Sequence, residues 1–497
     1  MATPTKDPLL ASSTEREILP KHLKPIHYDI TLEPHLEEAT EFDGTAVIDI
    51  NVVEETSSIT LNSVDLKILK TEVFAEDGKS MEISALDFDK VKERVTVGLK
   101  QKVTVGQKIK LKQIFKGSLL HSATAFFRSP IEIDGKTTWM ASSQLEATDA
   151  RRVFPCFDEP DLKATFTVTL IAKKDLTCLS NMDVASEKDV EKGRNAVTFN
   201  KTPPMSTYLL AFAIGDFKMI ETDSFRVPVR VYATADKNIE HARFAVEHCS
   251  RTLKVFEKIF DIDYPLPKMD FLAVPAQRGA MENWGLVIYG DTILLVDEKE
   301  STAEAFRWSA SVIVHELAHQ WFGNLVTMEF WDGLWLKESF ADWAELLAWT
   351  TLDPSWQMWT DFLTNGYQKG VFLDSNKASH PIEVPVNKAT EISQIFDDIS
   401  YSKGCAVLRM ISSQVGMETF VKGVRNYLKK AAYGNAKTID LWDALSEVSG
   451  QDVAGIMGAW TAHGMFCFLI SCPKTSSKMS MTWKSPSCSR IWLLSYP

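Results

Sequence analysis

The spacing of apolar residues changes partway along this sequence, and the change constrains the fold more than any other feature. Between about residues 24 and 216, apolar residues recur at every second position, which is the period of a strand with one buried face. The clearest runs are Ala46, Ile48, Ile50 and Val52; Val95, Val97 and Leu99; and Phe166, Val168 and Leu170. Stretches after about residue 250, such as 302–322 and 334–349, show helical spacing instead. We therefore expect an α+β chain whose N-terminal half is mainly antiparallel β.

The length of the chain predicts more than one domain. At 497 residues it exceeds the size at which a single hydrophobic core stops growing. We expect an N-terminal extension over residues 1–18, a β domain over 19–216, a second domain over 217–462 and an atypical tail over 463–497. Residues 453–497 contain no aspartate or glutamate. No fold is assigned to the tail, and its composition is closer to an altered reading frame, retained intron sequence or alternative ending than to a domain.

Charge and composition exclude several classes of protein. The 66 acidic and 54 basic side chains give a net charge of −12, which disfavours binding to a phosphate backbone, so no nucleic-acid partner is expected. The N-terminus lacks the apolar core of a secretory signal, and no apolar run approaches the roughly 20 residues of a membrane span. Seven cysteines without a CxxC pair favour reduced thiols. These features predict a cytoplasmic protein.

The pentapeptide HELAH at residues 315–319 gives the first indication of chemistry. Residues four apart share one face of a helix, so His315 and His319 can each direct an imidazole nitrogen at one metal ion, while Glu316 can reach a water on that ion. The pattern alone is a modest signal, because two ordinary helical histidines beside a solvated glutamate also produce it. A true site predicts a third protein donor, since a catalytic zinc ion has three protein ligands and an open position.

The helix that carries HELAH has predicted limits. Ser301 followed three residues later by Glu304 forms a capping box at its start, and Gly323 with Asn324 offers an end. HELAH is therefore expected to lie deep within the helix.

Glu338 is the predicted third donor. Eighteen residues separate it from His319, which is enough to end one helix, turn and present a glutamate from a second. The alternative is an exposed glutamate in the first turn of a helix, where its charge favours the helix dipole. The spacing resembles that of the gluzincin metallopeptidases.

Four further stretches carry a wider resemblance. They are GAMENWG at 279–285, QLEATDARRVFPCFDEP at 144–160, SHPIEVPV at 379–386 and IFDDISYSKGCAVLRM at 395–410. Together with HELAH they resemble the zinc aminopeptidases related to puromycin-sensitive aminopeptidase and aminopeptidase N, in the same order from about Leu19 to Trp460. The resemblance implies a saddle-like N-terminal β domain followed by a thermolysin-like α/β zinc metallopeptidase domain.

The resemblance also implies a role for each residue of the metal site. One zinc ion per chain would be bound by His315, His319 and Glu338, and Glu316 would act as general base. Tyr401 matches the family tyrosine that stabilises the oxyanion. The alternative for Tyr401 is a core tyrosine packed after the preceding segment.

The implied substrates are peptides with a free N-terminal amine. That amine is mostly cationic at neutral pH, so carboxylates can recognise it. Glu282 resembles the residue that does so, and Glu146 with Gln144 resembles the pair that lines the pocket for the amine and the first side chain. The other expected substrate-binding residues are Gly279, Ala280, Met281 and Asn283. Gly279 and Ala280 are expected to let the strand approach the peptide backbone closely, and Gly279 to allow backbone angles that other residues avoid; a plain turn glycine is the alternative.

Three residues near Glu338 add further expectations. Lys337 and Ser339 stand where many relatives have asparagine and glycine, so local packing is expected to differ without loss of a metal donor. Asp342, one helical turn further on, is a candidate acceptor for the second nitrogen of a zinc-bound histidine, with a simply solvated aspartate as the alternative.

Two hypotheses about activity follow. The related enzymes continue past the catalytic domain into a small β domain and a large helical domain that roofs the site, and this sequence stops where those would start. The chain is then either an active zinc aminopeptidase for short peptides, or a truncated form that binds zinc and peptide ends but is catalytically weak, inactive or unable to fold. The preferred N-terminal residue and the oligomeric state are left open.

Overall fold

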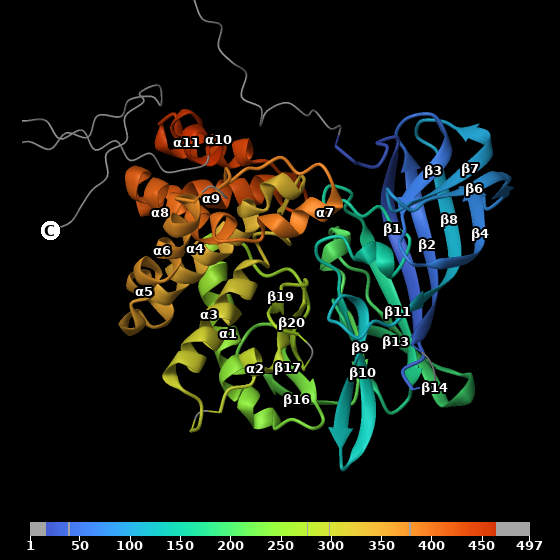
Figure 1. Cartoon of the computed structure of the whole chain (residues 1–497), viewed down its shortest axis with the longest axis horizontal. Coiled ribbons are helices and arrows are strands. Elements are labelled where there is room, and N and C mark those ends of the chain that lie inside the picture. The colour runs from blue at the N-terminus through green and yellow to red at the C-terminus, as the bar shows by residue number, and fades with distance from the viewer. Residues whose placement is uncertain (1–15, 38–39, 276, 298, 377–378, 464–497) are drawn as a thin grey trace, which may run out of the picture.

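The structure is a computed structural model that describes residues 16–463, apart from residues 38–39, 276, 298 and 377–378. Strands dominate the first half of the chain and helices the second, and the two parts lie side by side (Figure 1). The α+β class predicted from the sequence is thus confirmed. The predictions for residues 1–15 and for the tail from residue 464 onward lie outside the described residues.

Three sheets make up the N-terminal half. The largest has eight strands in the order β13-β14-β11-β1-β2-β8-β4-β5, and two smaller sheets have the orders β12-β15-β10-β9 and β3-β7-β6. The pairs are antiparallel apart from β1 and β11, which are parallel. The bounds are β1 (Leu23–Pro34), β2 (Glu41–Val52), β3 (Thr56–Asn62), β4 (Lys67–Ala75), β5 (Ser80–Met81), β6 (Ile83–Asp89), β7 (Arg94–Val103), β8 (Lys108–Ser118), β9 (Ala125–Ile133), β10 (Lys136–Gln144), β11 (Thr165–Lys173), β12 (Thr177–Ser180), β13 (Val184–Val190), β14 (Arg194–Phe199) and β15 (Phe212–Gly215).

The alternation predicted from the sequence is present in these strands. Ala46, Ile48 and Ile50 on β2 are at most 1% exposed, whereas the residues between them are more exposed. The predicted inward residues of β7 and β11 are also buried, namely Val95, Val97, Leu99, Phe166, Val168 and Leu170. All of them belong to one large apolar core, whose burial is the main stabilising contribution to such a sheet.

The second half begins with a five-stranded sheet in the order β16-β17-β18-β20-β19. Its central strands β17, β18 and β20 are parallel to one another. The strands of this half are β16 (Phe217–Thr222), β17 (Val229–Thr234), β18 (Met269–Val274), β19 (Ala280–Met281), β20 (Leu286–Gly290), β21 (Thr327–Met328) and β22 (Asn435–Ala436). The helices are α1 (Arg243–Phe260), α2 (Asp291–Leu294), α3 (Ala303–Ala318), α4 (Trp335–Leu352), α5 (Met358–Thr364), α6 (Gly366–Asp374), α7 (Ala389–Ile392), α8 (Gly404–Val415), α9 (Met417–Ala431), α10 (Thr438–Ser449) and α11 (Val453–Thr461).

The start of α3, the helix that carries HELAH, differs from the prediction by one residue. The hydroxyl of Thr302 caps the helix by accepting a hydrogen bond from Ala305 N at 3.2 Å. The predicted cap, Ser301, instead accepts from Asp297 N at 2.9 Å. The capping-box prediction was therefore wrong, because the hydroxyl of Ser301 is used in the preceding turn.

The end of α3 also differs from the prediction. The helix ends at Ala318, so His319 is the first residue beyond it and HELAH is not deep within the helix. The amide nitrogens of Asn324 and Leu325 donate to carbonyls five residues back, so the backbone turn that follows the helix and contains Gly323 is wider than an α-helical turn. HELAH thus occupies the last turn of α3 and the residue after it, with His315 and His319 directed at Glu338 of α4.

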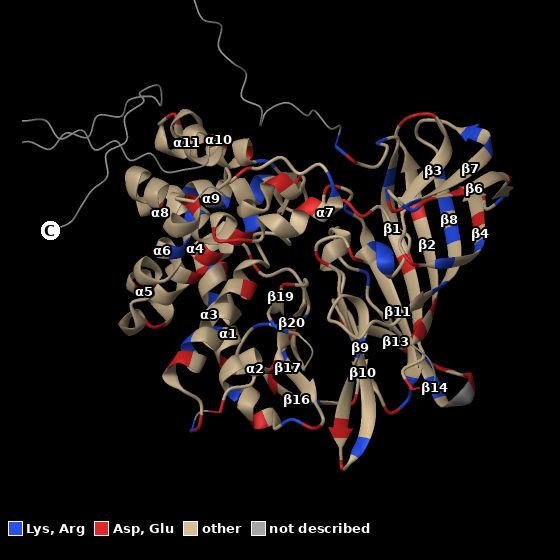
Figure 2. Ribbon diagram, viewed as in Figure 1, with Lys and Arg blue, Asp and Glu red and all other residues tan. Residues whose placement is uncertain are grey.

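The strand β8 carries several basic residues (Figure 2). Lys108, Lys110 and Lys116 on β8 each have a carboxylate partner at 2.8 to 3.7 Å; these partners are Glu76, Asp49 and Asp43. This row of lysines was not predicted from the sequence. Three of the four lysines of β8 are thus paired with carboxylates of β2 or of the turn after β4.

Two further expectations concern the membrane and the cysteines. Among the described helices, none is both long enough and apolar enough to cross a bilayer. The cysteines within the described residues are buried free thiols, as the sequence predicted; they are Cys156, Cys178, Cys249 and Cys405.

Candidate active site

The side chains of His315, His319 and Glu338 converge between α3 and α4. His315 Nε2 lies 3.0 Å from His319 Nε2, and Glu338 Oε2 lies 3.4 Å from each of these nitrogens. Tetrahedral zinc with bonds of about 2.0–2.1 Å places its ligand atoms about 3.3 Å apart. The two imidazole nitrogens and the carboxylate oxygen therefore fit a zinc ion in both type and spacing. Glu338 is only 2% exposed, so the alternative of an exposed glutamate is wrong.

The second nitrogen of each histidine has its own partner. His315 Nδ1 lies 2.9 Å from Asp342 Oδ1, and His319 Nδ1 lies 3.0 Å from the carbonyl oxygen of Phe322. Acceptors at Nδ1 leave Nε2 of each ring free to bind a metal. Asp342 thus lies where the sequence placed it, whereas the Phe322 carbonyl was not foreseen, because a backbone acceptor leaves no residue-type signal.

Glu316 lies beside these donors in a buried position. Its Oε2 has no hydrogen-bond partner within the described part of the chain. Burial raises the pKa of Glu316 to about 7, against the opposing effect of His315 and His319. A carboxyl group that titrates near neutrality can both accept and release a proton at that pH.

Tyr401 lies next to His315 on a π-helical turn, Ile399–Lys403, that leads into α8. The two rings are nearly parallel, with centroids 6.1 Å apart and planes 19° apart. Burial and the nearby charge of Glu338 raise the pKa of Tyr401 well above its usual value. Its hydroxyl is therefore protonated at neutral pH and able to donate a hydrogen bond.

A cluster of carboxylates adjoins the metal donors and encloses a lysine. Glu146, Glu282 and Glu338 have oxygen atoms within 4.8 Å of one another. Lys337 Nζ lies among them, 2.7 Å from Glu146 Oε1, 2.6 Å from Glu282 Oε1 and 2.7 Å from Glu338 Oε1. The sequence predicted only altered packing at Lys337. The structure instead places its ammonium group inside the predicted amine site.

The charges within this cluster depend on one another. Burial raises the pKa of both Glu282 and Glu338, but Lys337 and His319 reverse this effect, so that both pKa values fall below the usual range. Burial and the charge of Glu282 hold the pKa of Glu146 well above that range. Burial lowers the pKa of Lys337, yet the three carboxylates raise it well above its usual value. The lysine is therefore cationic at neutral pH.

The backbone of Glu282 is held by two amides that the sequence analysis missed. Asn324 Nδ2 and Gln320 Nε2 donate to the Glu282 carbonyl at 2.8 and 3.2 Å. Both side chains are fully buried and follow directly after HELAH in the run HQWFGN. Buried amides need partners, so two of them within an otherwise apolar run were a usable signal.

The glycine prediction for the GAMEN segment was placed at the wrong residue. The backbone of Gly279 does not have a positive φ, and a Cβ added there would meet no atom within 4 Å. Gly285 is the glycine that the conformation requires, because its φ is +81° and a Cβ would lie 2.4 Å from the carbonyl oxygen of Asn181. Open space beside Gly279 still leaves room for a ligand next to β19, which contains Ala280 and Met281.

The remaining predicted residues lie around the cluster without entering it. Gln144, at the end of β10, accepts a hydrogen bond from Gln277 Nε2 at 3.3 Å. Met281 is buried in the apolar core. Asn283 is also buried, and its Nδ2 has no partner among the described residues. The structure thus brings Glu146 and Glu282 together and leaves Gln144 linked to a different residue.

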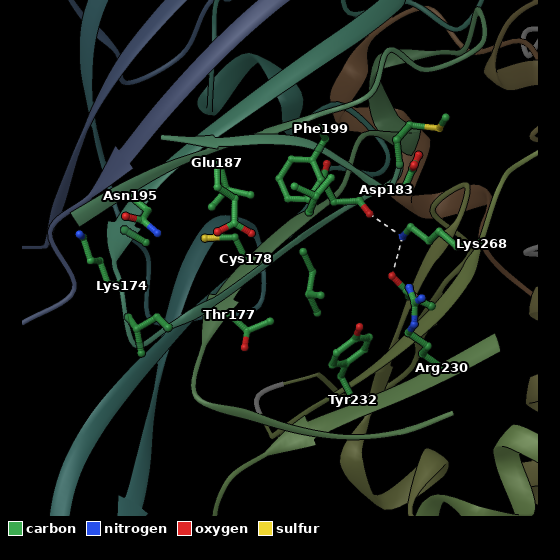
Figure 3. Close-up of a pocket in the computed structure, with 18 of the residues that line it drawn as sticks. Lys174, Thr177, Cys178, Asp183, Glu187, Asn195, Phe199, Arg230, Tyr232 and Lys268 are labelled. Carbon is green, nitrogen blue, oxygen red and sulfur yellow. Dashed lines mark hydrogen bonds and ion pairs between the residues drawn. The ribbon is translucent and has the colours of Figure 1, made fainter. Parts of the chain in front are cut away.

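A separate cavity of about 510 Å³ lies between the N-terminal sheets and the β17–β18 edge. Figure 3 shows Lys268 in its wall. Its ammonium group pairs with Asp270 at 2.7 Å and donates to the Ser180 carbonyl at 2.7 Å. Among the described residues that line this cavity, none belongs to the predicted site. The convergent donors, not this cavity, define the candidate active site.

Comparison with protein families gives two matches along the chain. Residues 24–209 match the peptidase M1 N-terminal domain, and residues 244–460 match the peptidase family M1 domain. The two matches follow one another and together cover most of the described residues.

Several curated proteins are similar to this chain. Alanine/arginine aminopeptidase of Saccharomyces cerevisiae is 46% identical over 94% of this chain and 54% of its own length. Aminopeptidase 2 of Candida albicans is 47% identical, with 90% and 48% covered, and aminopeptidase M1 of Arabidopsis thaliana is 44% identical, with 89% and 50% covered. The chain therefore spans about half the length of the curated relatives that it matches. By these matches the chain belongs to peptidase family M1.

Proposed function

We propose that this chain carries a zinc-dependent aminopeptidase site that hydrolyses the N-terminal bond of peptides. The observation that carries the proposal is the convergence of His315, His319 and Glu338 beside the buried Glu316. Membership of a peptidase family and relatives that are named aminopeptidases support the same reaction.

The proposed chemistry assigns one task to each side chain. His315, His319 and Glu338 would hold the zinc ion, which when bound polarises a carbonyl and lowers the pKa of its water toward about 7. Glu316 Oε2 would accept a proton from the attacking water and return it to the leaving amine, and its pKa of about 7 suits both transfers. The Tyr401 hydroxyl would donate a hydrogen bond to the carbonyl oxygen as negative charge builds on it.

Recognition of the peptide end is assigned to the carboxylate cluster. Glu282 and Glu146 would face the N-terminal ammonium group, with Gln144 at the edge of the pocket and with Gly279, Ala280, Met281 and Asn283 beside the peptide backbone. The support is that Glu146 and Glu282 share one cluster with Glu338. An internal peptide bond has no such amine, so the cluster favours exopeptidase chemistry.

Domain limits and compartment are also proposals. We propose a β domain over 19–216 and a thermolysin-like zinc domain over 217–462, in support of which each family match falls within one of these ranges. A cytoplasmic location stays a prediction, since one similar protein, from Saccharomyces cerevisiae, bears the name aminopeptidase 2, mitochondrial.

The test is hydrolysis of a panel of aminoacyl-fluorophore substrates by the purified 497-residue chain, with zinc content measured in parallel. We expect about one zinc ion per chain and turnover that falls by about 10²- to 10⁴-fold in Glu316→Gln. Glu159→Gln is the matched control, because Glu159 is a similarly buried glutamate in the N-terminal half. Equal turnover in wild type and Glu316→Gln would contradict the proposal.

A second candidate is a chain that binds zinc and peptide ends but is catalytically weak. The position of Lys337 within the amine site favours it. In the same experiment, zinc-loaded protein without turnover above the Glu316→Gln level would support this candidate over the first.

A further inference from the structure

The ammonium group of Lys337 lies within ion-pair distance of three carboxylates at once. Its Nζ donates a hydrogen bond to Glu282 Oε1 at 2.6 Å and forms ion pairs with Glu146 Oε1 and Glu338 Oε1, each at 2.7 Å. Lys337 is 1% exposed. Glu146 and Glu282 are the groups that the proposed function assigns to the N-terminal amine of a peptide, and Glu338 shares their cluster.

The side chain of Lys337 is enclosed along its length. A Cβ added to Gly323 would lie 3.2 Å from Lys337 Cδ, which shows how closely the aliphatic stem packs on that turn. The rings of Tyr208 and Phe396 lie 5.7 and 5.8 Å from Nζ. A flexible surface lysine could change rotamer and leave the site to a second cation. The packing of the aliphatic stem of Lys337 and the two aromatic rings near its Nζ oppose such a movement.

The lysine is compatible with an occupied metal site. Glu338 directs Oε2 toward the two histidines and Oε1 toward Lys337, so the two contacts use different atoms. Binding of zinc therefore does not require Lys337 to leave the cluster. A second ammonium group, however, would enter a buried site that already holds one positive charge, and like charges in close contact are disfavoured there.

We infer that Lys337 is a specificity-determining residue whose ammonium group holds the place of the substrate N-terminal amine, so that a free amine adds little to ligand binding. The inference rests on the proposed function for the assignment of Glu146 and Glu282 to that amine. It goes further in naming the side chain that reduces selection for a charged N-terminus in this chain.

The test measures binding rather than turnover. Leucinol and 4-methylpentan-1-ol differ only in the amino group, and neither has a bond that a peptidase cleaves. We would titrate both into the zinc-loaded full chain by calorimetry and compare the two dissociation constants. In the wild-type chain the amine is expected to improve affinity by less than about threefold. An improvement of a hundredfold in the wild-type chain would overturn the inference.

Variants at Lys337 make the comparison decisive. Lys337→Met keeps the length of the side chain and removes the charge, and Lys337→Asn is a shorter neutral replacement should the first variant be unstable. Either variant is expected to raise the advantage of leucinol at least tenfold above its wild-type value. The added substitution Glu282→Gln should remove most of that gain, which a general loosening of the fold would not do.

The outcomes separate this inference from the proposed function. An unchanged ratio of dissociation constants in folded Lys337 variants would overturn the inference, and so would the failure of both ligands to bind to these variants. Absence of turnover in every zinc-loaded variant would contradict the proposed function, yet the binding ratio would still decide the role of Lys337.

Discussion

The two oxygens of Glu338 face two regions of the site that are built in different ways. Oε2 faces His315 and His319, whose relative positions follow from four residues of spacing at the end of α3. Oε1 faces a cluster that draws on α4, the segment after β10 and the segment after β19. The first region depends on a local interval, and the second on packing between distant segments. A substitution in one region therefore need not remove the contacts of the other region.

The largest expected effect is on the metal region. His319→Ala removes a nearly fully buried donor, so zinc should fall from about one ion per chain to near none and turnover should be lost. Metal analysis after dialysis measures this, with His248→Ala as control, because His248 is also buried but stacks between Phe244 and Trp349. A His319→Ala protein that retained one zinc ion would show that the three donors do not form the site.

Tyr401→Phe tests the group that adjoins both regions. Loss of a donor to the developing oxyanion should lower kcat by about 10²- to 10³-fold while zinc content and KM change little. Steady-state kinetics measures this, and Tyr427→Phe, at a buried tyrosine of α9, is the control. If Tyr401→Phe kept kcat within twofold of wild type, the core-tyrosine alternative would be correct.

Glu345→Gln removes a buried carboxyl group that lies near His315 and is protonated at neutral pH. Burial and the charge of Asp342 raise the pKa of Glu345 to about 8, against opposing effects of His315 and Ser311. The unfolded group titrates near pH 4.3, so the folded state holds an extra proton and wild-type stability falls as pH rises from about 4.5 to 8. The free energy of unfolding of the variant, relative to wild type, should therefore increase by about 2 to 3 kcal/mol between pH 5 and 7.

Urea unfolding followed by tryptophan fluorescence measures that difference, with both proteins treated with the same chelator so that metal release does not contribute. Parallel pH profiles for the two proteins would show that Glu345 is ionised in the folded state.

Asp342→Asn tests how firmly the metal region is oriented. The carboxylate lies 2.9 Å from His315 Nδ1, and loss of such a partner lowers zinc affinity by about 10- to 100-fold. Competition with a chromophoric chelator measures this affinity, and Asp353→Asn at the end of α4 is the control. Unchanged affinity would mean that Asp342 is simply a helix-surface aspartate.

The same contrast explains what the sequence could predict. His315, Glu316, His319 and Glu338 were identified because a helix fixes side-chain directions at known intervals. The inward residues of β2, β7 and β11 were found for the corresponding reason in strands. Lys337 was read only as a change in packing, because its direction depends on Glu146 and Glu282, which lie far from it in the sequence. The cap at Thr302 was missed because two adjacent hydroxyls were available, and that of Ser301 binds Asp297 N instead. The early end of α3 was missed because the backbone bonds that follow it leave no residue-type signal.

The smallest predicted effect links the two regions. Ser339 Oγ donates to the Ser400 carbonyl at 2.6 Å and so joins α4 to the turn that carries Tyr401. Ser339→Ala removes this bond, which should cost about 1 kcal/mol and lower kcat a few-fold by loosening Tyr401, without loss of zinc. Thermal unfolding and kinetics measure these changes. The control is Ser309→Ala, since the buried Ser309 hydroxyl has no partner among the described residues.

If Ser339 acts through Tyr401, Ser339→Ala should not lower kcat further in a Tyr401→Phe background. An additive loss there would mean that Ser339 supports the metal region directly.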